Sequence, residues 1–304
     1  MQEGSRKAIM AAFFANLGIA IAKFAAFAIT GAASLLAEAV HSCADTGNQG
    51  LLFLGGHKAK KNPSKEHPFG YGRERFFWSF VVALVLFSLG SLFAIYEGIT
   101  KLSDPHPIED PTVAFVVLGL AIVLEGLSLR TARREANAER GGRSWWRFIE
   151  SAKSPELPVV LLEDFGAIVG LLIALTGVGL SAMTGNSLYD ALGSIGIGLL
   201  LGVIAIVLAT EMKSLLIGES ATEQEVAAID LVITQDLAVR KLIFLRTQHL
   251  GPEELLVAAK VEFNSESVGQ LIGAINTLEA SIRKAVNSTC VIFIEPDVYR
   301  PELD

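Results

Sequence analysis

Residues 76–96, FFWSFVVALVLFSLGSLFAIY, contain no charged side chain. A helix needs about 20 such residues to cross a hydrocarbon core of roughly 30 Å. Residues 165–189 and 191–210 are uncharged in the same way. The 304-residue chain is 51% hydrophobic and only 19% charged, whereas soluble domains carry about 25% charged residues. The sequence therefore predicts an α-helical membrane protein that lies in the lipid bilayer.

Three weaker apolar segments, at about 8–30, 34–57 and 111–129, raise the number of predicted transmembrane helices to six. An even number of spans places both termini on one side of the membrane. The loops on that side carry nearly all the basic residues of the membrane part, namely Arg6, Lys7, Lys58, Lys60, Lys61, Lys65, Arg73, Arg75, Arg130, Arg133, Arg134, Arg140, Arg143, Arg147 and Lys153. The opposite side has Lys101 alone. The positive-inside rule then predicts a multi-pass protein with both termini in the cytoplasm, in the inner membrane if the source is bacterial.

The composition changes after the last span, so we expect a membrane domain over 1–212 and a cytosolic domain over 213–304. A helix at about 222–236 is predicted to begin with a capping box at Thr222 and Glu225. Further elements are predicted in the order strand, strand, helix, strand, at 240–250, 255–263, about 267–286 and 289–296. This α-β-β-α-β order predicts a small α+β domain of ferredoxin-like type, with both helices on one face of the sheet.

A run of polar residues interrupts the second predicted span, at residues 37–50, AEAVHSCADTGNQG. With Glu38 placed at 0° on a helix, His41 falls at about −60°, Asp45 at about −20°, Asn48 at about −80° and Gln49 at about 20°. All five share an arc of roughly 100° on an otherwise apolar helix. Ionisable residues inside a membrane usually face a bundle interior or a wet cavity, and they mark ion pathways. The alternative is that the stripe only joins helices by hydrogen bonds.

His41 and Asp45 are one helical turn apart, a spacing at which an imidazole and a carboxylate can hold one cation. Such a donor pair suits borderline divalent metals, zinc foremost. A second acidic pair, Glu163 and Asp164, begins the fifth predicted span. Adjacent side chains are 100° apart on a helix, so one carboxylate can face a cavity while the other faces it obliquely. Alternatively, one of the two caps the start of the helix.

These motifs, taken together, resemble the cation diffusion facilitator family. The resemblance rests on HSCADTGNQ, HPFGYGR, LLEDFGAIVG and the GP between the C-terminal strands, and it covers nearly the whole chain. The HS-x-x-D-x-x-NQ and LLED forms most resemble the ZnT-nine-like branch. The resemblance implies that His41, Asp45 and Asp164 bind the transported ion. The residue four positions before Asp164 is Val160, which has no donor atom, so Glu163 or a water is expected as the fourth ligand.

The resemblance also implies metal efflux from the cytoplasm by a homodimer, with zinc exchanged for protons. Ligands must lose their protons to bind metal, so metal and protons compete for one site. Glu38 and Asn48 are candidates for orienting the ligands or relaying protons. Because position 160 is a valine and not a histidine, the site has one imidazole fewer, and manganese, iron and cobalt remain alternatives to zinc as the transported metal. We do not expect the accessory metal sites of some family members in this chain, because Tyr71, Lys260 and Phe293 occupy positions where those relatives have metal ligands. His249 has no ligand partner nearby in the sequence and is expected to be an ordinary residue near the end of a strand.

Two other classes of protein compete with a transporter. A membrane metal sensor would bind metal without moving it. An intramembrane hydrolase would need a nucleophile or a metalloprotease helix, and the sequence contains neither a G-x-S-x-G nor an H-E-x-x-H run. We therefore expect no enzymatic activity, no cofactor and no nucleic-acid partner. The expected ligands are a transiently bound divalent metal ion and protons.

Overall fold

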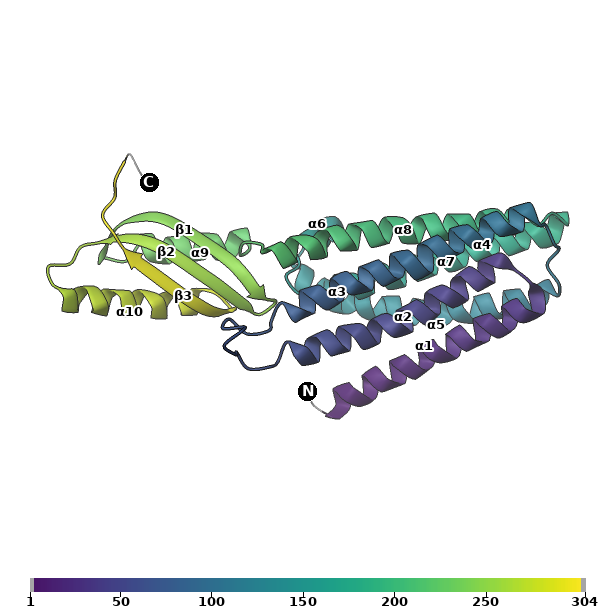
Figure 1. The fold of residues 1–304 in the computed structure, drawn as a ribbon, viewed down its shortest axis with the longest axis horizontal. Helices are drawn as coiled ribbons and strands as arrows, with labels where there is room; N and C mark the ends of the chain where they lie inside the picture. The colour runs from purple at the N-terminus through teal and green to yellow at the C-terminus, as the bar shows by residue number, and fades with distance from the viewer. Residues whose placement is uncertain (1–2, 302–304) are drawn as a thin grey trace. The chain divides into compact units, whose positions relative to one another are not determined.

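The computed structural model describes residues 3–301, with the side chains of 16–86 and 89–301 (Figure 1). The side chains of Arg6 and Lys7, used above to orient the chain, lie outside these residues, as do residues 1–2 and 302–304 at the ends of the two predicted domains. The chain forms two compact units. A helical unit holds the chain up to Gly55, with Phe77–Glu150 and Pro155–Met212, and a C-terminal unit holds Gly56–Phe76, Ser151–Ser154 and the chain from Lys213 onward.

Long helices make up nearly all of the helical unit. They are α1 (Glu3–Thr30), α2 (Ala33–Lys58), α3 (Glu74–Val85), the π-helical turn η1 (Leu86–Ser91), α4 (Leu92–Ser103), α5 (Pro111–Arg140), α6 (Trp145–Ser151), α7 (Glu156–Thr184) and α8 (Leu188–Ile217). By length and composition, four described helical stretches can cross a membrane: Glu74–Ser103, Pro111–Arg140, Glu156–Thr184 and Leu188–Ile217. The apolar part of α1, Asn16–Thr30, is shorter. This composition is that of a multi-pass membrane protein.

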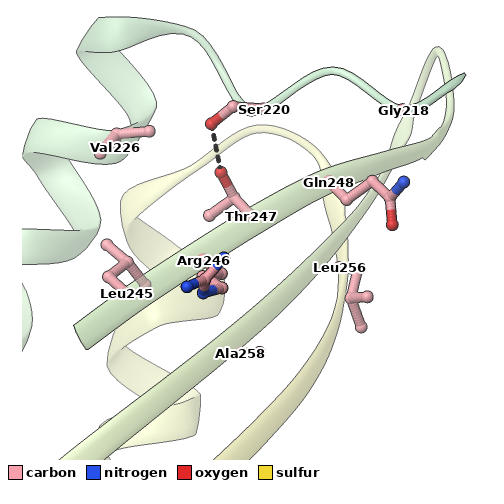
Figure 2. Close-up of a pocket in the computed structure, with 9 residues that line it drawn as sticks. All are labelled: Gly218, Ser220, Val226, Leu245, Arg246, Thr247, Gln248, Leu256 and Ala258. Atoms are coloured by element: carbon pink, nitrogen blue, oxygen red, sulfur yellow. Dashed lines mark hydrogen bonds between the residues drawn. The ribbon is translucent and has the colours of Figure 1, made fainter. Parts of the chain in front are cut away.

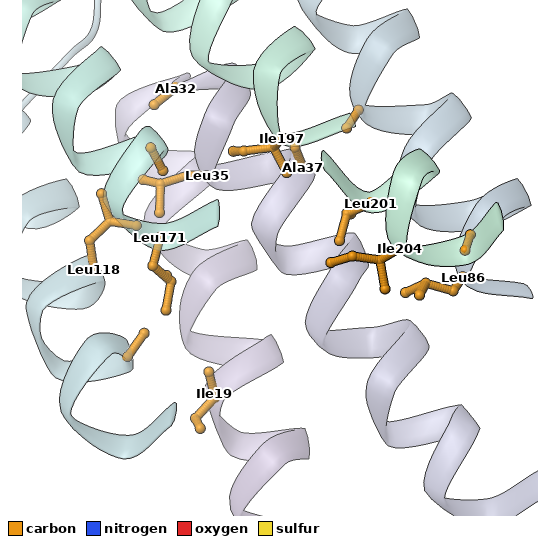
Figure 3. Close-up of a cluster of buried hydrophobic side chains, with 14 of the residues drawn as sticks. Ile19, Ala32, Leu35, Ala37, Leu86, Leu118, Leu171, Ile197, Leu201 and Ile204 are labelled. Atoms are coloured by element: carbon orange, nitrogen blue, oxygen red, sulfur yellow. The ribbon is translucent and has the colours of Figure 1, made fainter. Parts of the chain in front are cut away.

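The core of the helical unit is built from small and branched apolar side chains contributed by α1, α2, α3, η1, α4, α5, α7 and α8 (Figure 3). Its fully buried members include Leu35, Leu86, Leu118, Leu171 and Ile197. Helices α4 and α8 approach closely through glycine. A Cβ added at Gly98 would lie 2.7 Å from the Ala191 carbonyl oxygen, and one at Gly198 would lie 2.8 Å from that of Ser91. The glycines of α8 therefore serve packing between helices.

The boundary between the last two helices differs from the uncharged runs in the sequence. Helix α7 ends at Thr184, where Gly185 adopts a positive φ of 71°. Helix α8 starts at Leu188 and carries Asp190 in its first turn. Helix α7 therefore ends at a glycine C-cap, before Asp190, the charged residue that separates the two uncharged runs of the sequence. The basic segment 131–157 is also not one loop, because α5 continues to Arg140 and α6 follows it.

A buried ion pair joins the starts of α2 and α8 to the end of α4. The Lys101 ammonium lies 2.8 Å from Asp190 Oδ2 and donates to the Gly31 carbonyl at 2.7 Å. Asp190 also accepts hydrogen bonds from the Ala33 amide at 2.8 Å, the Ser34 amide at 3.3 Å and the Ser34 hydroxyl. The carboxylate thus caps the positive end of α2. Asp190 is fully buried.

The C-terminal unit has a three-stranded sheet and two helices. Its elements are α9 (Glu223–Thr234), β1 (Val239–Gly251), β2 (Glu254–Phe263), α10 (Val268–Ala285) and β3 (Thr289–Pro296). Strand β2 pairs antiparallel with β1 and parallel with β3. The inward side chains of β2 share one core with apolar residues of both helices, including Ile229, Val257 and Leu278, so α9 and α10 cover one face. The predicted Thr222–Glu225 capping box is confirmed.

The loop that carries HPFGYGR belongs to this C-terminal unit. Gly72 lies against the β1–β2 turn, where a Cβ added to it would come 2.8 Å from the Leu250 carbonyl oxygen. Arg75 lies 3.5 Å from Glu253 on the same turn. The ring of Tyr71 packs on His67 at 4.6 Å between centroids. The structure thus shows a loop that packs on the sheet.

The Lys101–Asp190 pair generates a stability prediction. Asp190→Ala leaves the Lys101 ammonium buried and removes the cap of α2, so we expect it to lower the free energy of unfolding by about 3–5 kcal/mol. Thermal unfolding of the purified protein in detergent measures this change. Asp230→Ala, at an exposed position of α9, is the control and should leave the melting temperature nearly unchanged. Equal melting temperatures for the two variants would contradict the structural role given to Asp190.

Candidate metal site in the helical unit

His41 and Asp45 lie next to each other on α2, as their spacing predicts. The His41 Nε2 atom is 3.5 Å from Asp45 Oδ2. His41 is fully buried, and the Asp45 side chain is 13% exposed. Both ring nitrogens of His41 and the Oδ1 atom of Asp45 are buried without a hydrogen-bond partner within the described part of the chain. Buried polar atoms usually find a partner, so these three require an explanation.

Glu38, one turn before His41, is held by a lysine from α1. The Lys23 ammonium donates to Glu38 Oε2 at 3.0 Å and to the Ser42 hydroxyl at 2.7 Å, and the side chains of Lys23 and Glu38 are both fully buried. The other carboxylate oxygen, Oε1, has no hydrogen-bond partner among the described residues and lies beside Gly170 of α7, which leaves no room for a Cβ there. Lys23 thus pairs with a buried carboxylate.

The adjacent carboxylates Glu163 and Asp164 of α7 point to different neighbours. Glu163 accepts a hydrogen bond from the Asn48 amide of α2 at 2.8 Å. Asp164 accepts one from the Ser128 hydroxyl of α5 at 2.8 Å. Helix α7 begins at Glu156, two turns earlier, so neither residue caps the helix start. The alternative interpretation of the sequence, that one of the two caps the start of the helix, is therefore wrong.

The structure brings the candidate residues into one region without assembling a coordination sphere. Among the described side chains, 16–86 and 89–301, no group of three or more His, Cys, Asp or Glu is placed so that it could hold a metal ion. His41 and Asp45 form a pair, and Glu163 and Asp164 are hydrogen-bonded to Asn48 and Ser128 respectively. The arrangement can bind a divalent cation only after these side chains turn toward one point.

Glu125 of α5 is a buried acidic residue that the sequence analysis did not single out. It is 7% exposed. Its neighbours along the buried face of α5 are Ala and Leu, at Ala114, Leu118, Ala121, Ala132 and Ala136. The helical spacing of this stripe was available in the sequence and is the signal that could have identified Glu125 as buried.

The C-terminal unit contains a buried histidine and a polar pocket, at separate places. The His249 Nδ1–H donates to the Gly251 carbonyl at 3.3 Å, which leaves Nε2 buried without a hydrogen-bond partner among the described residues. Figure 2 shows the pocket, where the Ser220 and Thr247 hydroxyls are 2.8 Å apart. The residues known to line it, Gly218, Ser220, Val226, Leu245, Arg246, Thr247, Gln248, Leu256 and Ala258, include no His, Cys, Asp or Glu. These pocket residues therefore do not resemble a metal site.

Lys260 of β2 is held by an ion pair on the same sheet. Its ammonium lies 2.7 Å from Asp297 Oδ2. The hydrogen bond from Lys260 lowers the pKa of Asp297 to about 2, so the pair stays charged at neutral pH. A charged lysine offers no lone pair to a metal.

Comparison with known proteins identifies the family. Residues 9–217 match the model of the cation efflux transmembrane domain. The chain belongs to the cation efflux family. This is the cation diffusion facilitator family that the motifs of the sequence resemble.

Curated relatives extend the match beyond the membrane domain. The chain is 35% identical over 268 residues to the mitochondrial proton-coupled zinc antiporter SLC30A9 of Homo sapiens, a match that covers 88% of this chain and 47% of the relative. It is 33% identical over 268 residues to metal tolerance protein C4 of Arabidopsis thaliana, covering 88% of the chain and 59% of that protein. It is 26% identical over 293 residues to the cation-efflux pump FieF of Citrobacter koseri, covering 96% of the chain and 92% of the pump. The chain thus spans about half the length of the first of these relatives.

The Lys23–Glu38 pair predicts strong coupling between two substitutions. Lys23→Met and Glu38→Gln should each destabilise the protein, because each leaves the other partner buried and unpaired. The double variant should be more stable than the sum of the single effects predicts, by a coupling of about 0.5–3 kcal/mol. Chemical unfolding of all four proteins in detergent gives this coupling. Additive effects would mean that the two side chains do not interact in the folded protein.

Burial of His249 predicts a pH-dependent stability of the C-terminal unit. Burial lowers the pKa of the His249 imidazole below the usual 6.5, so the unfolded chain binds a proton at a higher pH than the folded unit does. The free energy of unfolding should therefore fall as the pH drops below about 6.5 and be retained above it. Hydrogen exchange of the β1 and β2 amides at pH 7.5 and 5.5, corrected for intrinsic rates, measures this.

The matched variants separate His249 from other titrating groups. His249→Gln keeps a side-chain N–H donor but does not titrate, so it should weaken the loss of protection at pH 5.5. His67→Gln, at an exposed position of the same unit, should retain the pH dependence of the unaltered protein. An unchanged pH dependence in His249→Gln would show that another group is responsible.

Proposed function

We propose that the protein exports a divalent metal cation, zinc foremost, across its membrane in exchange for protons. The observation that carries this proposal is the set of unpartnered donor atoms on His41 and Asp45, buried in the transport domain of a cation efflux protein. A buried polar atom without a partner costs about 1–3 kcal/mol. A bound metal ion would interact with these donor atoms, which have no hydrogen-bond partner among the described residues. The printed name of the human relative, a proton-coupled zinc antiporter, supports zinc and protons as the exchanged ions.

The proposed ligands are His41, Asp45 and Asp164, with Glu163 or a water in the fourth position. Asp164 and Glu163 are held by single hydrogen bonds from a hydroxyl and an amide, and both neutral donors can be exchanged for a cation without leaving a buried charge unpaired. Glu38, fixed by Lys23, would orient His41 from one turn away or accept protons through its free oxygen. Asn48 would hold Glu163 in place.

The exchange follows from the acid–base chemistry of these ligands. Imidazole and carboxylate bind metal only when deprotonated, so each metal ion that binds displaces protons. When the site opens to the cytoplasm it would take metal and lose protons; when it opens to a more acidic outside it would take protons and release metal. Export of metal would then be driven by the inward movement of protons. The cargo is a substrate, and no resident cofactor is proposed.

We further propose six transmembrane spans, with α1 and α2 joining the four more apolar stretches, and with both termini in the cytoplasm. The basic segment at the end of α5 and in α6 supports that orientation. Residues 1–212 would form the transport domain. Residues 213–304 would form a ferredoxin-like cytosolic domain through which two copies of the chain associate.

Flux into proteoliposomes under an imposed pH gradient tests the transport proposal. We expect proton-linked zinc uptake that Asp45→Asn abolishes, because the amide keeps the shape of the side chain but loses the charge that binds a cation. Asp230→Asn in the C-terminal unit is the matched control and should transport normally. Manganese, iron and cobalt are measured in parallel, since one imidazole among oxygen ligands does not restrict the site to zinc.

The outcomes separate transport from sensing. Flux of another metal without zinc would keep the mechanism and change the cargo. Metal binding without flux of any of the four metals would overturn the transport proposal and favour a membrane metal sensor.

A further inference from the structure

Glu125 is the single charged residue in the buried stripe of α5. The stripe consists of Ala114, Leu118, Ala121, Glu125, Ala132 and Ala136, which lie within an arc of roughly 60° at helical spacing. Lys and Glu are almost never buried this deeply unless they are paired. No hydrogen bond or ion pair is formed by the Glu125 carboxylate within the described part of the chain. The residue is 7% exposed, and a carboxylate at such a position favours a ligand or a counter-charge.

The position of Glu125 on α5 relates it to the candidate metal site. Ser128, three residues later and therefore on nearly the same side of the helix, donates its hydroxyl to Asp164 of α7 at 2.8 Å. This bond turns the Glu125 side of α5 toward the acidic end of α7.

The three ligands proposed above, His41, Asp45 and Asp164, leave a fourth position for Glu163, a water or a further group. Helix α2 offers two donors one turn apart, His41 and Asp45. Helix α7 offers Asp164, but one turn before it stands Val160, which has no donor atom. Glu163 is engaged by Asn48 at 2.8 Å, on the α2 side of α7. Glu125 lies one turn before Ser128, which contacts Asp164, and its carboxylate has no hydrogen-bond partner among the described side chains, 16–86 and 89–301.

We propose that the Glu125 carboxylate is a ligand of the transported metal, so that α2, α5 and α7 each contribute donor atoms. This inference rests on the transport function proposed above. One imidazole and three carboxylates form a set of mainly oxygen donors, which binds zinc but discriminates less against manganese than a site with more imidazoles does. Glu125 therefore also influences which metals the protein accepts.

Metal binding to the full chain in lipid nanodiscs tests the proposal. Cobalt(II) is the probe, because its absorption spectrum reports the number and type of its ligands, and zinc affinity follows from competition. Glu125→Gln should weaken cobalt and zinc binding by about tenfold or more and change the cobalt spectrum. Glu135→Gln makes the same substitution at an exposed position of the same helix and should stay within about twofold of the unaltered protein.

A second variant distinguishes a ligand from a charge that acts at a distance. Glu125→His replaces one donor by another, so it should retain zinc binding and shift the zinc-to-manganese affinity ratio toward zinc by about tenfold. A group that acts only through its negative charge would lose affinity for both metals equally in Glu125→His, and that result would overturn the proposal. Should Glu125→Gln not fold, Glu125→Asp, which withdraws the carboxylate by one methylene, takes its place, and unchanged affinity there would equally overturn it.

Asp45→Asn separates this inference from the transport proposal. If Asp45→Asn abolishes binding and flux while Glu125→Gln binds like the unaltered protein, the transporter stands and Glu125 is not a ligand. If the unaltered protein moves no metal, the transport proposal fails whatever the affinity of the Glu125 variants.

Discussion

The cost of burying charge among apolar helices is the constraint on which the helical unit depends. An uncompensated buried charge is expensive, so it must be paired or hydrogen-bonded. Lys23 meets this requirement for Glu38, and Lys101 meets it for Asp190. The first pair joins the consecutive helices α1 and α2, and the second joins α4 to α8, which is far from it in the sequence. The Asp190 cluster also satisfies amides at the start of α2, so it fixes the end of the helix that carries the candidate ligands.

In contrast to these ion pairs, His41 and Asp45 have buried atoms without a hydrogen-bond partner among the described residues, which indicates a different role. A packing role would be expected to give a buried imidazole at least one hydrogen bond, yet neither ring nitrogen has one within the described residues. The same helix therefore contains two kinds of polar residue. Glu38 is held by the protein, whereas His41 and Asp45 are left for something that binds. This difference, more than the presence of polar residues in an apolar helix, distinguishes a binding site from hydrogen bonds between helices.

The sequence predicted what depends on local periodicity. The stripe on α2, the His41–Asp45 contact and the Thr222 cap follow from spacing along one helix, and the structure contains all three. Contacts between helices were not predictable in this way. Glu163 meets Asn48 across 115 positions, and which of two adjacent carboxylates faces α2 is decided by packing. The start of α8 was misplaced because the two uncharged runs are divided at Asp190, whereas α7 ends at a glycine C-cap, Gly185.

The adjacent carboxylates of α7 explain why donors from more than one neighbouring helix matter. Two side chains 100° apart cannot both point at α2, and the hydrogen bonds show that only Glu163 does, while Asp164 turns to α5. A cation held by α2 and α7 alone would draw Asp164 away from Ser128 and leave α5 without its link to the site. A cation held also from α5 would keep the three helices together. In the proposed transporter, the opening and closing of the site would then involve α5 as well as the two helices that carry the recognised motifs.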